Sequence, residues 1–124
     1  MTSPAPGATA TAARITGAVT ATLGAALLLR PAAVTRLASG HGDAPPVVVA
    51  RVLGGRQLLQ GIALITRPQP PLVAIAVAAD VLHAASMLLL AWIRPGYRRP
   101  AIVSAAAATA SAGCGAMILR GIHR

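Results

Sequence analysis

The stretch that decides the fold is residues 47–93, VVVARVLGGRQLLQGIALITRPQPPLVAIAVAADVLHAASMLLLAWI. It contains two long apolar runs, 47–66 and 72–93, separated by the turn Pro68-Gln69-Pro70-Pro71. A helix needs about 20 mostly apolar residues to cross the hydrocarbon core of a bilayer, and proline interrupts a helix interior. This stretch therefore predicts a hairpin of two transmembrane helices.

The same pattern continues on both sides of this hairpin. Further apolar runs cover residues 13–29 and 101–119, and the connections at 30–46 and 94–100 are rich in Pro, Gly and Arg. Residues 32–39 in the first connection are suited to a short interfacial helix. We predict an all-α four-helix transmembrane bundle, up-down-up-down with short loops, formed by one membrane domain over residues 13–124. Residues 1–12, rich in Pro, Ala, Thr and Ser, read as a disordered lead.

The first apolar run has a competing interpretation as a signal peptide. Such a peptide has a basic segment before its apolar stretch, whereas the only early cation here is Arg14. The pair Arg30-Pro31 then interrupts the region where cleavage would occur. We expect a retained transmembrane helix.

Composition excludes a soluble enzyme. Among 124 residues, 56% are apolar and 10% are charged, against about 25% charged in soluble domains. The net charge is +9, but the arginines are scattered at the ends of the apolar runs, where cations meet anionic lipid headgroups. We therefore expect a multi-pass membrane protein with the lipid bilayer as its partner and no nucleic acid. The arginines divide almost evenly between the two faces, so the orientation of the termini stays open.

Two opposite charges lie at matched depth within the central hairpin. Arg56 is 12.5 residues before the point midway between Pro68 and Gln69, and Asp80 is 11.5 residues after it. At a rise of about 1.5 Å per residue their depths differ by about 1.5 Å. An arginine in the middle of a span costs about 2.5–3.5 kcal/mol on insertion scales, so it needs a partner. We predict an intramembrane ion pair between Arg56 and Asp80.

Two further polar residues share this face of the hairpin. Gln60 follows Arg56 by four positions and His83 follows Asp80 by three, which are the spacings of neighbours on a helix. Arg51 should face elsewhere. The predicted polar patch is therefore Arg56, Gln60, Asp80 and His83. It is either a self-satisfied network that fixes helix register or a proton or ligand site, since ionisable residues inside membranes are often functional.

The chain lacks the residues that a metal site, a haem site or a covalent catalytic mechanism would need. Asp80 and His83 supply two ligands, and no Cys, Glu or second His in a span completes a metal site with them. Only one histidine is at membrane depth, which argues against bis-histidine haem ligation. No nucleophile–base set is recognisable. We therefore expect no metal, no cofactor and no enzymatic activity.

The remaining features are expected to be structural. Trp92 and Tyr97 flank the same end of one span and are predicted interfacial anchors. Rows of small residues (Gly17, Ala21, Ala25; Thr20, Gly24; Ala107, Ser111, Gly115) are suited to close helix packing, either within the chain or at a homodimer seam. The lone Cys114 is expected to be a small apolar residue of a helix.

The run Arg51-Val-Leu-Gly54-Gly-Arg56-Gln-Leu-Leu-Gln-Gly61, followed by an Asp in the next helix, resembles small four-helix DoxX-like membrane proteins of bacteria. Their second helix often carries an R-x-x-G-x-R-x-x-x-x-G pattern. The resemblance implies a four-helix fold and a bacterial cell membrane as the location, and little chemistry. Some relatives are associated with quinone or thiol redox systems, but with Cys114 as its single cysteine this chain is not expected to share that redox chemistry.

Together these patterns favour a non-catalytic integral membrane protein, acting as an accessory or structural component with a membrane protein partner or as a homo-oligomer. The alternative is a minimal proton-coupled transporter in which Asp80 is the proton acceptor and His83 or Arg56 tunes it.

Overall fold

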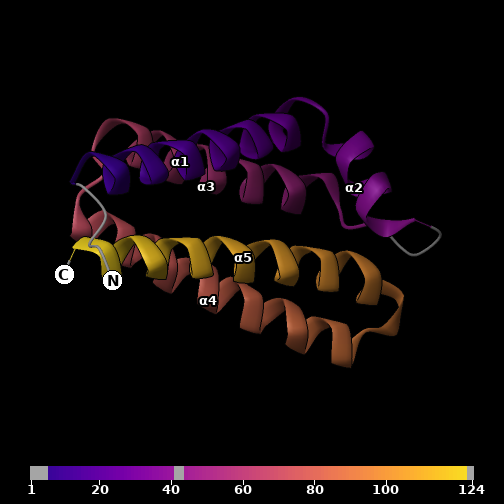
Figure 1. Cartoon of the computed structure of the whole chain (residues 1–124). Coiled ribbons are helices and arrows are strands. Elements are labelled where there is room, and N and C mark those ends of the chain that lie inside the picture. The colour runs from indigo at the N-terminus through magenta and orange to yellow at the C-terminus, as the bar shows by residue number, and fades with distance from the viewer. Residues whose placement is uncertain (1–5, 41–43, 123–124) are drawn as a thin grey trace.

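The computed structural model describes residues 6–40 and 44–122, and every regular element in these residues is helical (Figure 1). The helices are α1 (Pro6–Leu29), α2 (Pro31–Ser39), α3 (Val47–Thr66), α4 (Pro70–Ile93), the 3₁₀ turn η1 (Pro95–Tyr97) and α5 (Arg98–Ile122). Helices α1, α3, α4 and α5 are each long and apolar enough to cross a membrane. The all-α four-helix prediction is confirmed.

The helix ends follow the predicted boundaries closely, with one correction. Helix α3 covers the predicted 47–66, whereas α4 and α5 extend slightly beyond the runs predicted for them. The predicted disordered lead is wrong for residues 6–12, which form the first turns of α1. There the Thr11 hydroxyl donates to the Gly7 carbonyl, so this threonine satisfies its hydroxyl within the helix. The rest of the predicted lead, residues 1–5, lies outside the described residues.

The four long helices form two tightly packed pairs, α1 with α3 and α4 with α5 (Figure 1). Glycines bring α1 and α3 together. A Cβ built on Gly24 would lie 2.6 Å from the Gly54 carbonyl oxygen, and one built on Gly17 would lie 2.7 Å from that of Gly61. Only a residue without a side chain allows this backbone approach, which is a common way for membrane helices to associate.

Helices α4 and α5 pack through a different set of small residues. The buried face of α5 is a stripe of alanines at helical spacing, Ala101, Ala105, Ala108 and Ala112. Gly115 continues this face, since a Cβ there would meet the side chain of Val77 on α4. Of the small-residue rows predicted from the sequence, Gly17 and Gly24 of α1 and Gly115 of α5 pack inside the chain. The rest of the row predicted for α5 does not form the buried stripe, since Ala107 is exposed and Ser111 is half-buried.

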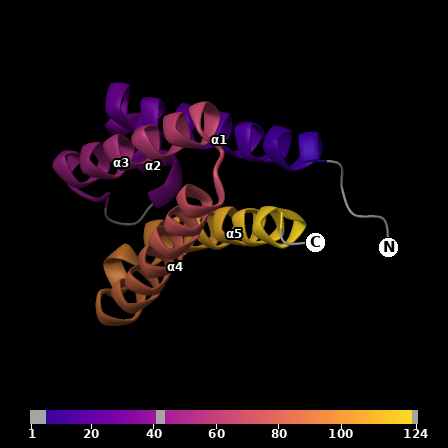
Figure 2. The ribbon, with the colours of Figure 1, turned by 90° about the vertical axis from the view of Figure 1, so that its left-hand side faces the viewer.

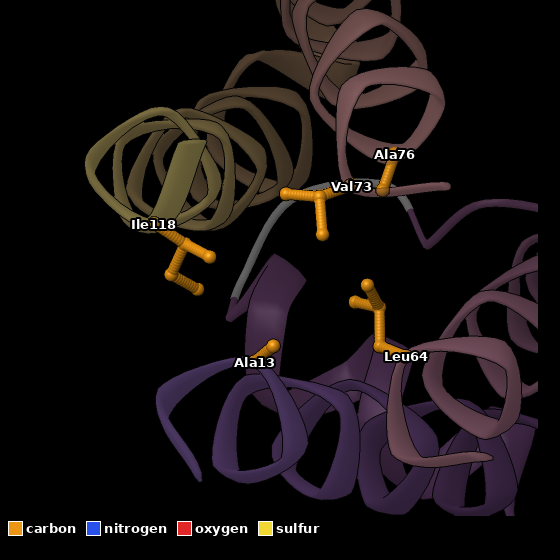
Figure 3. Close-up of a cluster of buried hydrophobic side chains, with 5 residues drawn as sticks. All are labelled: Ala13, Leu64, Val73, Ala76 and Ile118. Carbon is orange, nitrogen blue, oxygen red and sulfur yellow. The ribbon is translucent and has the colours of Figure 1, made fainter. Parts of the chain in front are cut away.

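The two pairs meet at one end of the bundle and diverge toward the other (Figure 2). At the closed end, beside the turn between α3 and α4, Leu64 packs against Val73 and Ala76 of α4, with Ala13 of α1 and Ile118 of α5 completing the core (Figure 3). The start of α1 and the end of α5 lie at this same end (Figure 1). Consequently α3 and α4 are consecutive in the chain but make few backbone contacts.

The short helix α2 lies at the open end of the bundle (Figure 1). It buries Pro31, Thr35 and Ser39 and ends at Gly40, whose φ is +60°. A Cβ at Gly40 would clash with the guanidinium of Arg99, so α2 is held close to the start of α5. A short helix is therefore present where one was expected, at residues 32–39, and its placement in the membrane interface stays a prediction.

Candidate functional site

The predicted pairing of Arg56 with Asp80 is present between the two helix pairs. Arg56 Nη2 donates to Asp80 Oδ1 at 2.9 Å, across from α3 to α4. The Asp80 side chain is 9% exposed and that of Arg56 is 32% exposed. The carboxylate is thus withdrawn into the bundle, while the guanidinium retains some contact with the surroundings.

Gln60 completes the coordination of the carboxylate. It lies one helical turn after Arg56, and its Nε2 donates to Asp80 Oδ2 at 3.3 Å. Its Oε1 is 3.4 Å from Arg56 Nη2, at the long end of hydrogen-bond distances. Both carboxylate oxygens of Asp80 are therefore occupied by donors from one face of α3. Arg51, on the same helix, is exposed and takes no part.

His83 lies beside this cluster but pairs with a different residue. Its Nε2 is 2.8 Å from Ser104 Oγ of α5, so it connects the two helices of the second pair. His83 and Ser104 share a cavity of about 40 Å³ with Arg56 and Asp80. We call this the polar cavity. One water needs about 10–15 Å³, so the polar cavity has room for about three.

Two residues of the site were not predicted from the sequence. Ser104 belongs to a helix that sequence reasoning could not place against His83. Gln57 lines the polar cavity, and its Oε1 is buried without a hydrogen-bond partner among the described residues. The adjacent polar residues Arg56 and Gln57 within an apolar run were the available signal, because a polar residue inside a span usually faces the bundle interior.

A second, larger cavity of about 270 Å³ lies between the two helix pairs at the open end of the bundle. We call it the apolar cavity, and its wall includes Leu27 of α1, Ala38 of α2, Val49 of α3, Leu90 of α4 and Ala101 of α5. It lies next to the polar cavity, because Gln57, His83 and Ser104 line both.

The two aromatic residues lie in different surroundings. Trp92 is 78% exposed, which suits the predicted anchoring in the membrane interface. Tyr97 is half-buried and lines the apolar cavity. Its side chain is therefore also part of an internal wall, a position that the sequence did not suggest.

The site offers hydrogen bonding and charge compensation. Within residues 6–40 and 44–122, no three side chains of His, Cys, Asp or Glu gather as a metal site would require. The described ionisable groups at this depth are instead an arginine, a carboxylate and an imidazole next to a cavity of water size.

Comparisons with protein families, with curated proteins and with solved structures find no match to this chain.

Proposed function

We propose that this chain is a small, non-catalytic integral membrane protein whose polar network joins its two helix pairs. The observation that supports this role is the occupation of both oxygens of Asp80, by Arg56 and by Gln60. A carboxylate held in this way is paired with a cation and accepts a hydrogen bond at each oxygen, as a structural buried charge requires. In this proposal the chain serves as an accessory or structural subunit for another membrane protein, or as a homo-oligomer.

The test is proton flux in proteoliposomes that contain a pH-sensitive dye. We expect the wild-type chain to leave the proton permeability of the vesicles unchanged under an imposed pH or voltage gradient. A stable partner should copurify from native membranes in mild detergent, or the chain should run as a defined oligomer. Protein-dependent proton flux that is lost in Asp80→Asn would refute the structural role.

A second candidate function is a minimal proton-coupled transporter with Asp80 as the proton acceptor. The polar cavity favours it, because Asp80 and His83 both line a space large enough for water. Water molecules between two titratable groups could carry a proton. The same flux assay separates the two functions, and Arg51→Gln is the matched control, since Arg51 lies on α3 outside the site.

The membrane location of the chain and its kinship with DoxX-like proteins are also proposed. Four apolar helices support a multi-pass membrane protein. We further propose the bacterial cell membrane as its location, because the arginines at the ends of its helices suit anionic headgroups. Kinship with DoxX-like proteins remains a prediction from residues 51–61. Fractionation of membranes from the source cells tests the location.

A further inference from the structure

The apolar cavity has the size of a small-molecule site. Its volume is about 270 Å³. A cavity of about 150 Å³ lined by apolar side chains is known to bind benzene, so by proportion this one holds a molecule of about ten carbon atoms. Ligand sites in proteins are mostly apolar, with a few polar groups that fix the orientation of the ligand.

The wall of the apolar cavity determines the polarity of its occupant. Among the described residues that line it, none is Arg or Asp, and most are aliphatic. The one histidine of the wall, His83, already pairs through Nε2 with Ser104, so a charged ligand would find no carboxylate or guanidinium there and would lose its hydration with little compensation. The occupant that suits this wall is uncharged and largely apolar.

Among the described residues of the wall, one buried polar side-chain atom lacks a hydrogen-bond partner. Thr35 Oγ1 donates to the Pro31 carbonyl, and His83 pairs with Ser104. By contrast, Gln57 Oε1 is buried without a hydrogen bond to any described residue. A buried acceptor left unpaired is costly. Because Oε1 is itself buried, a ligand in the cavity gains a hydrogen bond to it only when the side-chain amide turns to face the ligand.

Gln57 also determines which polar group the ligand should carry. A half-turn of the terminal side-chain torsion exchanges the amide oxygen and nitrogen, and this torsion is soft. A hydroxyl both donates and accepts, so it pairs with whichever amide atom faces it, whereas a carbonyl pairs only with the nitrogen. We propose that the apolar cavity binds an uncharged, mostly apolar alcohol or phenol of about ten carbon atoms, whose hydroxyl hydrogen-bonds to Gln57.

The experiment compares 2-naphthol with naphthalene, which has the same ten-carbon ring system without the hydroxyl. Wild-type protein in lipid nanodiscs is dialysed against each probe, and uptake by empty nanodiscs of the same lipid is subtracted. We expect saturable binding of one 2-naphthol per chain. Its affinity, corrected for partition into lipid, should be about fivefold higher than that of naphthalene, as a single net hydrogen bond provides.

Variants assign the binding to the cavity and to Gln57. Gln57→Leu should lower the affinity for 2-naphthol to that for naphthalene. Ala38→Phe, which fills part of the cavity from α2, should abolish the saturable binding of both probes. Ala78→Phe, at an exposed position of α4 outside the cavity wall, is the matched control and should bind as the wild type does.

Three results would overturn the proposal. They are no saturable uptake of 2-naphthol by the wild type, equal corrected affinities for the two probes, and unchanged binding in Ala38→Phe. The first two use the wild-type chain, so the test does not depend on the folding of any variant. Among the described residues, the hydrogen-bond partners of Asp80 are Arg56 and Gln60, and Gln57 is neither, so failure of 2-naphthol binding would overturn this proposal and leave the proposed structural role to the proton-flux assay.

Discussion

Replacing both members of the Arg56–Asp80 pair with leucine should cost less than the two single replacements together. Two unit charges about 4 Å apart attract by about 4 kcal/mol at an effective dielectric constant of 20. Removing one partner of a buried pair typically costs about 3–5 kcal/mol, because the other charge stays buried and uncompensated. The two side chains are unequally exposed, so the two single variants should not cost the same.

Arg56→Leu should be the more damaging single change. It leaves Asp80, with 9% of its side chain exposed, supported by Gln60 alone, and we expect a loss of about 3 kcal/mol in the free energy of unfolding. Asp80→Leu leaves Arg56, whose side chain is 32% exposed and can reorient toward water or headgroups. Here we expect a loss of about 2 kcal/mol, after allowing for that exposure.

The double variant Arg56→Leu/Asp80→Leu should lose only about 2 kcal/mol, since no charge is left unpaired. The coupling energy between the two positions is then about 3 kcal/mol. The assay is reversible unfolding in mixed detergent micelles, followed by circular dichroism or by the fluorescence of Trp92. Arg51→Leu, at an exposed position of the same helix, should stay within about 0.5 kcal/mol of wild type. If the single effects add to within about 0.5 kcal/mol, the pair contributes no stability and the reasoning is wrong.

Two further predictions use the same unfolding assay with matched controls. Gly24→Ala should destabilise by about 2 kcal/mol, because its Cβ would lie 2.5 Å from a backbone nitrogen of α3; Gly55→Ala, with no atom within 4 Å of the new Cβ, should instead stabilise by up to about 1 kcal/mol. Equal effects of the two would contradict the packing of α1 on α3. Ser104→Ala should cost about 1 kcal/mol through the lost bond to His83. Ser86→Ala, whose exposed hydroxyl bonds only within its own helix, should change little, and a Ser104→Ala variant as stable as Ser86→Ala would argue against the interhelical bond.

The sequence predicted the features that depend on hydropathy and on the number of residues between a side chain and the nearest turn. The span at residues 47–66 was predicted to the residue, because prolines and arginines mark its ends. The pairing of Arg56 with Asp80 followed from counting outward from the turn, which fixes depth whether or not the two helices pack closely. Gln60 followed from its position one turn along the same face.

Features that depend on which helices pair could not be predicted in this way. The sequence did not indicate that α4 would pack against α5, so the bond from His83 to Ser104 was missed. The divergence of α3 from α4, which creates the apolar cavity, was missed for the same reason. One signal was available: Gly17 and Gly24 are seven residues apart, as are Gly54 and Gly61. Matching glycine spacings on two antiparallel helices indicate a shared contact face.

Because the two helix pairs diverge, the position of the Arg56–Asp80 pair has a consequence for the apolar cavity. The turn at 67–69 joins the two helix pairs at their closed end, and α1 and α3 diverge from α4 and α5 away from it. The bond from Arg56 to Asp80 connects the two pairs between this turn and the open end, and the apolar cavity lies between the bond and the open end. We expect an occupant that forces the helix pairs apart to lengthen the Arg56–Asp80 bond, and loss of that bond to let the pairs separate. By thermodynamic linkage, each of these events makes the other easier by the same factor.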